Sequence, residues 1–96
     1  MATDDSTFAA IKDPQAILDY DINWTPFLKG DTIVDSSWTI DPAGALTNAS
    51  ESFTTTGTVI WLTGGNRGRF YKVINHVTTA GGREDDRTIL VEMKNK

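Results

Sequence analysis

Cysteine is absent from the 96-residue chain, which excludes a disulfide framework, a thiolate nucleophile and a cysteine-type zinc site. Long apolar runs are absent too, since none approaches the roughly 20 residues that a membrane-spanning helix needs. The N-terminal stretch MATDDSTFAAIKD has neither the basic region nor the apolar region of a secretory signal. We therefore expect a soluble protein that is made in the cytoplasm and does not contact a membrane.

Basic residues are few in the first half of the chain. Residues 1–51 contain nine acidic residues and two lysines, whereas residues 52–96 contain four acidic and seven basic residues. The net charge of −4 and the pI of about 4.7 argue against duplex nucleic acid as the main partner. Either the two halves interleave and neutralise each other across strands, which we favour, or they form two faces of opposite sign that suit the stacking of subunits.

Strand patterns dominate the sequence that is present. In residues 17–24, ILDYDINW, every second residue is apolar, which is the signature of a half-buried strand. Further strands are predicted at residues 32–40, 56–62, 69–79 and 87–93, with one or two short edge strands within residues 45–53. Residues 25–31, which contain Pro26 and Gly30, predict a turn or a single helical turn.

About six or seven short strands separated by turn signals predict an all-β fold. The spacing is typical of a β-sandwich of immunoglobulin or fibronectin III type. We assign residues 15–96 to this sandwich and residues 1–14 to an N-terminal arm. A chain of this size buries only about 60–65% of its unfolded surface, which suffices for one core but not for an additional deep active site.

Aromatic side chains are expected to dominate the core, because each buries a large area. The apolar face of residues 17–24 should pack against Trp38, Trp61 and Val73. Val34 is expected on the same face as Trp38, and Phe53 is expected to point inward. Tyr71 enters a long strand after a glycine-containing turn, where sandwiches carry a tyrosine corner, although an ordinary buried tyrosine fits equally well.

The residues that could act in catalysis or bind a metal are better explained as solvent-exposed surface residues. His76 is the only histidine, and its place in mid-strand, opposite to the Tyr71 face, favours an exposed or interface role over that of a catalytic base. Asp19 and Asp21 have no visible cleft, so they are interpreted as a solvated face rather than as a glycosidase pair. The acidic run 84–86 lacks the pattern of a calcium loop, and the glycine-rich residues 64–69 lack that of a phosphate-binding loop. We expect no enzyme activity, no catalytic residue, no cofactor and no metal.

Docking to other proteins is the remaining interpretation. Phe8 and Ile11 are the apolar anchors of the arm, Arg67 and Arg69 lie in the glycine-rich turn, and His76 lies on an exposed strand face. These five residues are the predicted partner-binding residues. The arm could add to the sheet edge of a neighbouring subunit, and a disordered tail is the alternative.

A family likeness agrees with these features. Its distinctive pieces are Asp13-Pro14 with Leu18-Asp19-Tyr20 and Trp24, Gly30-Asp31-Thr32-Ile33 with Ser37-Trp38, Val59-Ile60-Trp61-Leu62 with Gly64-Gly65, and Val77-Thr78-Thr79 through Gly82-Arg83 and Asp86-Arg87. In order and spacing, from about Asp13 to Met93, they resemble the phage fiber-tail adaptor family, which comprises short immunoglobulin-like virion proteins of tailed bacteriophages.

The resemblance implies a non-catalytic structural component of a virion, a tail or neck adaptor that docks fibers or other tail proteins. The partners are then other virion proteins. We also expect several copies in a symmetric assembly, no binding to nucleic acid or membrane, and synthesis in the host cytoplasm. A capsid decoration (cement) protein and a small carbohydrate-binding β-sandwich module are the alternatives.

Overall fold

The computed structural model describes residues 7–94, which form seven strands and one helical turn. In chain order these elements are β1 (Thr7–Lys12), β2 (Ile17–Asn23), α1 (Thr25–Leu28), β3 (Ile33–Asp41), β4 (Leu46–Phe53), β5 (Gly57–Gly64), β6 (Phe70–Thr79) and β7 (Glu84–Met93). Within this part of the chain, no helix is long and apolar enough to cross a membrane.

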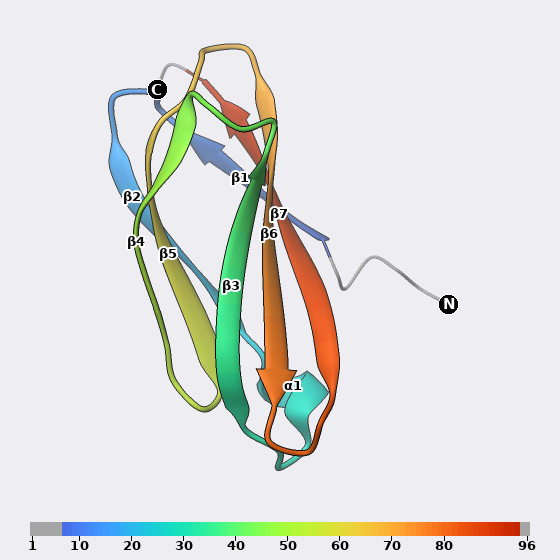
Figure 1. The fold of residues 1–96 in the computed structure, drawn as a ribbon. Helices are drawn as coiled ribbons and strands as arrows, with labels where there is room; N and C mark the ends of the chain where they lie inside the picture. The colour runs from blue at the N-terminus through green and yellow to red at the C-terminus, as the bar shows by residue number, and fades with distance from the viewer. Residues whose placement is uncertain (1–6, 95–96) are drawn as a thin grey trace.

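The strands form two facing sheets (Figure 1). The four-stranded sheet has the order β1-β7-β6-β3, and the three-stranded sheet has the order β2-β5-β4. All neighbouring strands are antiparallel except β1 and β7, which are parallel. The all-β sandwich prediction is confirmed, and the strand order is compatible with an immunoglobulin-like topology.

The core lies between the sheets and includes a polar network that joins them. The Trp24 indole, at the start of α1, is fully buried and donates from Nε1 to Asn75 Oδ1 at 3.0 Å and to Thr58 Oγ1 at 3.2 Å. Thr58 donates to the same Asn75 oxygen at 2.7 Å, and the Asn75 amide donates to Ser36 Oγ at 2.9 Å. Because these residues come from both sheets, the network fixes how the sheets face each other.

Tyr71 forms a tyrosine corner, which is one of the two alternatives that the sequence left open. Its ring is buried, and its hydroxyl accepts the backbone N–H of Asn66, five residues upstream, at 3.0 Å. This contact ties the loop between β5 and β6 to the core, as a tyrosine corner does in other sandwiches.

Three core assignments are wrong in part or in whole. Trp61 lies on the outer face of β5, with 42% of its surface exposed, whereas Trp38 packs against the core as predicted. Val34 is 54% exposed because a bulge between Ile33 and Asp35 shifts the phase of β3. Phe53 opposes buried Thr58 but is 42% exposed, since β4 is an edge strand that the other sheet covers incompletely.

Residues 7–12 of the expected arm pair with a strand of their own chain. β1 lies along β7 from Thr7 opposite Thr88 to Lys12 opposite Met93. Lys12 is buried, and its ammonium donates to the carbonyls of Asp13 and Gly64 at 3.0 and 2.9 Å. Residues 1–6 lie outside the described residues, and the division of the chain at residue 14 stays a prediction.

Candidate docking surfaces

An apolar hollow opens on the outer face of the four-stranded sheet, where β1 and β7 end and β6 begins. It has a volume of about 400 Å³ and is lined by Ala9, Ile11, Phe70, Leu90 and Glu92, among others. The pairing register explains this grouping, since Ile11 and Phe70 flank Glu92 from either side. Ile11 is 43% exposed and Phe70 is 55% exposed, so a partner could cover both side chains.

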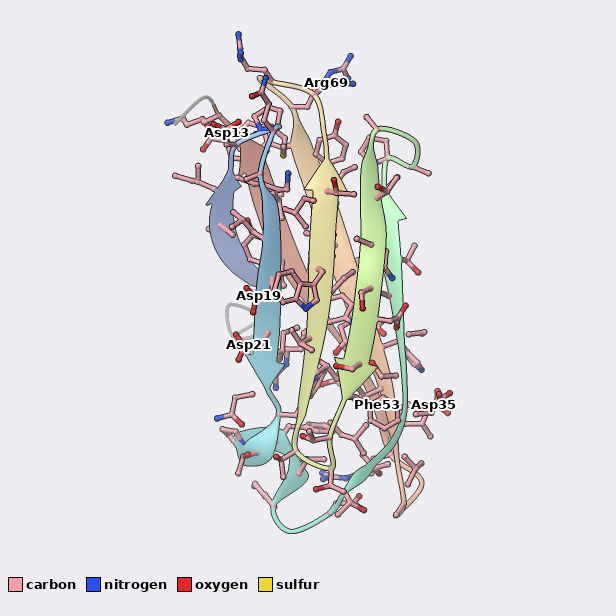
Figure 2. All side chains as sticks on the ribbon, turned by 90° about the vertical axis from the view of Figure 1, so that its left-hand side faces the viewer. Asp13, Asp19, Asp21, Asp35, Phe53 and Arg69 are labelled. Atoms are coloured by element: carbon pink, nitrogen blue, oxygen red, sulfur yellow. The ribbon has the colours of Figure 1, made fainter. Side chains whose placement is uncertain are left out.

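Four exposed cations lie near this hollow, next to its lining residues in the chain or in the strand register. Arg67 and Arg69 lie in the loop before β6, which is held to the end of β7 because Gly68 N donates to the Met93 carbonyl at 2.9 Å and Met93 N donates to the Arg69 carbonyl at 2.9 Å. Figure 2 shows Arg69 at this end of the sandwich. Lys72 lies opposite Leu90, and Lys94 follows β7.

We call this region the basic end, and it consists of the hollow together with Arg67, Arg69, Lys72 and Lys94. Within residues 7–94, neither Arg67 nor Arg69 forms an ion pair. The one ion pair of the basic end in this part of the chain joins Lys94 Nζ to Glu92 Oε2 at 3.8 Å. Asp13 and Asp41 also lie near the basic end. Exposed cations beside exposed apolar side chains suit a partner that is both acidic and apolar.

His76 lies farther along β6 on the same outer face, about 20 Å from Phe70 by strand geometry. Its Nδ1 is 2.5 Å from Asp86 Oδ1 and its Nε2 is 2.8 Å from Glu84 Oε1, both on β7. Hydrogen bonds to Asp86 and then to Glu84 raise the pKa of His76 above its usual 6.5. When the ring is protonated it donates from both nitrogens, and the imidazolium then has no free lone pair with which to act as a base.

The outer face of the three-stranded sheet has the opposite character. Its strands, β2, β5 and β4, contain no lysine, arginine or histidine. Figure 2 shows Asp19 and Asp21 along β2, and in the register Asp19 lies opposite Trp61. Ile17, which is 61% exposed, is on the same face. We call Ile17, Asp19, Asp21 and Trp61 the acidic face.

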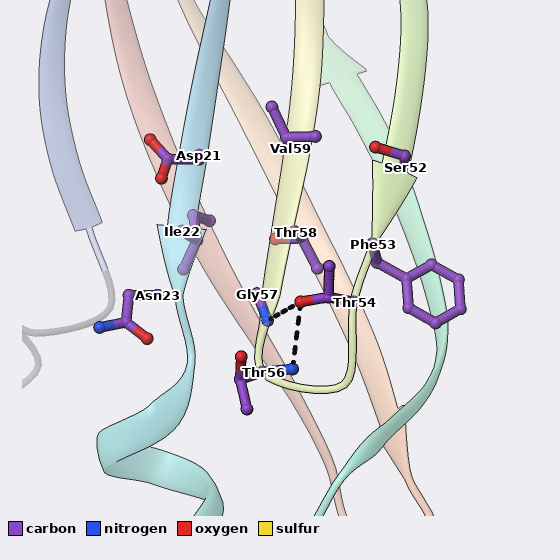
Figure 3. A pocket seen from close by; sticks show the side chains of 10 residues that line it. All are labelled: Asp21, Ile22, Asn23, Ser52, Phe53, Thr54, Thr56, Gly57, Thr58 and Val59. Carbon is purple, nitrogen blue, oxygen red and sulfur yellow. Dashed lines mark hydrogen bonds between the residues drawn. The ribbon is translucent and has the colours of Figure 1, made fainter.

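A second hollow, of about 430 Å³, lies at the α1 end of this sheet (Figure 3). Gly57 has no side chain to fill it, and Asp21, Asn23 and Ser52 border it. Thr54 Oγ1 accepts the backbone N–H groups of Thr56 and Gly57 at 3.3 and 3.1 Å. His76 belongs to the other sheet, so this hollow has no imidazole base, and no metal-binding group occurs among residues 7–94.

The structure brings together only part of the predicted site. Ile11, Arg67 and Arg69 meet at the basic end, whereas His76 lies elsewhere on the same sheet. The backbone of Phe8 pairs with that of Ile89 in β7.

Sequence reasoning missed two of the exposed apolar residues, Phe70 and Trp61. The exposure of Phe70 could have been predicted from its place in the strand, because neighbouring residues of a strand point to opposite faces and Tyr71 points inward. Trp61 is likewise out of phase with Ile60 and Leu62, which are buried.

Comparison with known proteins identifies the family. The family model described as Podophage GP4 fiber-tail adaptor protein gp77 matches residues 12–92, which cover β2 through β6 and all but the last residue of β7. No curated protein matches the chain. The chain therefore belongs to the podophage GP4 fiber-tail adaptor family, and its role is that of a structural adaptor in the phage tail.

Proposed function

We propose that this protein acts without catalysis, in several copies, and that it docks tail or fiber proteins through the basic end. The family match over residues 12–92 is the observation that carries the proposal. An adaptor needs surfaces that other proteins can cover, and the basic end presents exposed Ile11 and Phe70 beside Arg67 and Arg69. The net charge of the chain, −4, supports a protein partner rather than nucleic acid. The protein reaches the virion after synthesis in the host cytoplasm.

The surroundings of His76 support the absence of catalysis. Both ring nitrogens contact carboxylates, and the side chain lies on an open sheet face rather than in a cleft. We expect His76→Ala to leave the fold and the plaque titre nearly unchanged. A hydrolytic activity that disappears in this variant while the fold persists would contradict the proposal.

Phages that carry Phe70→Asp test the docking surface. This change places a charge in the apolar hollow without touching the core, so we expect purified particles to lose the adaptor or the proteins that it docks. Protein composition can be measured on gels and fiber content by electron microscopy. Val34→Asp is the matched control, because Val34 is an equally exposed apolar residue of the same sheet, away from the hollow. Normal composition and fiber content in Phe70→Asp particles would refute docking at the basic end.

A further inference from the structure

The three-stranded sheet carries negative charge that its own strands do not compensate. Asp19, Asp21 and Glu51 are its ionisable acids, and β2, β4 and β5 contain no cationic side chain. Within residues 7–94, neither Asp19 nor Asp21 has an ion pair. A partner that covers the acidic face must therefore supply cations.

The acidic face is also apolar at its centre. Trp61 lies on the middle strand, flanked by Asp19 on β2 and Ser50 on β4. Tryptophan is enriched at the centres of protein interfaces, where its large ring is desolvated. The exposed ring of Trp61 beside the Asp19 carboxylate thus indicates a partner with a cationic rim and an apolar centre.

The basic end of the same chain has these two properties. Ile11, Phe70 and Leu90 supply the apolar surface, and Lys72 and Arg69 supply exposed cations next to it. The acidic face and the basic end belong to different sheets, so they point away from each other on one molecule. One copy can use both at once.

Pairing through two identical surfaces is disfavoured. A two-fold contact between two acidic faces would bring Asp19 and Asp21 of both copies together, and a two-fold contact between two basic ends would do the same for the cations. Like charges brought together at an interface oppose association. A head-to-tail contact places opposite charges together, and such heterologous contacts repeat into rings or open filaments.

We propose that copies of this chain stack head to tail, with the basic end of one copy on the acidic face of the next. This inference rests on the proposed docking role of the basic end and names a second copy of the chain as its partner. Charge attraction across the contact makes the stacking weaker at high salt.

Complementary charge reversal tests the contact in the purified full-length protein. One variant carries Asp19→Lys and Asp21→Lys, so both of its surfaces are basic, and a second carries Arg69→Glu and Lys72→Glu, so both are acidic. All four side chains are exposed, and circular dichroism checks that the fold persists. Sedimentation velocity is measured on each variant alone, on their equimolar mixture and on the wild type.

We expect the wild type to form species larger than a monomer that dissociate as salt is added. Each variant alone should be monomeric, and the mixture should regain the large species, because each variant then finds its complement. Asp35→Lys, with the same charge change at an exposed aspartate of β3, should associate as the wild type does, whereas Asp19→Lys should associate less. A wild type that stays monomeric at about 1 mM, or a mixture that stays monomeric, would overturn the stacking.

The particle experiment separates this inference from the proposed function. If the wild type is monomeric but Phe70→Asp particles lose the adaptor, stacking is wrong and the basic end docks another tail protein. If the charge-reversed mixture assembles but Phe70→Asp particles are normal, copies stack in solution through the basic end, and the proposed role of the basic end in docking tail or fiber proteins in the particle is wrong.

Discussion

At the scale of single residues, tryptophans of one chain have opposite roles. Trp24 is fully buried and hydrogen-bonded, whereas Trp61 is 42% exposed on the acidic face. We expect Trp24→Ala to lower the free energy of unfolding by about 3–5 kcal/mol, as truncations of buried aromatic residues do. Trp61→Ala should lower it by less than about 1 kcal/mol. Denaturant midpoints measure both, and equal losses would contradict the assignment of Trp61 to the surface.

His76 should titrate above its usual range. Asp86 and Glu84 raise its pKa, so the folded protein holds this proton to a higher pH than the unfolded chain does. The stabilisation is therefore complete below about pH 6.5 and is lost as the pH rises through the folded pKa. Since the side chain is 42% exposed, solvent screening keeps the effect small. We expect an NMR titration to give His76 a pKa above 6.5 that is lower in Asp86→Asn. An unchanged pKa in that variant would show that Asp86 does not raise the pKa of His76.

At the scale of elements, β1 is the strand whose role differs most from expectation. An apolar arm free to join a neighbour needs no partner in its own chain, yet residues 7–12 pair with β7 and Lys12 is buried. Burial lowers the pKa of Lys12, against the weaker opposite effect of Asp13. The ammonium is accepted in this site because two backbone carbonyls receive its hydrogen bonds.

Deleting residues 1–12 should therefore destabilise the sandwich. The loss of the β1 ladder and of the Lys12 contacts exposes the edge of β7, and we expect the free energy of unfolding to fall by about 2–5 kcal/mol. Chemical denaturation measures this fall, and Ile11→Ser, which keeps the backbone pairing, is the control. A truncated chain with the wild-type midpoint would show that β1 is dispensable for folding.

Strand identity was predictable where alternation is strict, and strand phase was not predictable at bulges. β6 buries every second residue from Tyr71 to Thr79, and β7 does so from Ile89 to Met93, as the sequence indicates. In β3 and β4 the register shifts between Ile33 and Asp35 and between Asn48 and Ser50. One extra residue in a strand moves every later side chain to the opposite face of the sheet. The local composition of β3 and β4 does not reveal where such a bulge occurs.

At the scale of the whole molecule, Asn75 couples the two sheets. Its oxygen accepts from Trp24 and Thr58, and its amide donates to Ser36 Oγ and to the Ser37 carbonyl. Asn75→Ala would leave several buried polar groups without partners, so we expect a loss of about 2–5 kcal/mol in the free energy of unfolding. Ser36→Ala, which removes one of these contacts, should cost less. Equal midpoints for Asn75→Ala and the wild type would mean that the network is unimportant.

The sequence by itself determined the all-β class, the approximate strand positions, the outward phase of His76 and the family resemblance. These properties depend on local alternation and on residue order, both of which can be read along the chain. Arg67 and Arg69 were predictable as exposed turn residues for the same reason.

Only the tertiary structure decided which surfaces exist. The basic end brings together residues from β1, β6 and β7 that lie up to about 80 positions apart in the chain, because parallel pairing of β1 with β7 places Ile11 beside Glu92. The sequence places Trp61 on the opposite face of β5 from Ile60 and Leu62, and the tertiary structure decided which of these two faces is the inner one. Which apolar residues are buried depends on what the facing sheet covers, and that is a property of packing rather than of sequence.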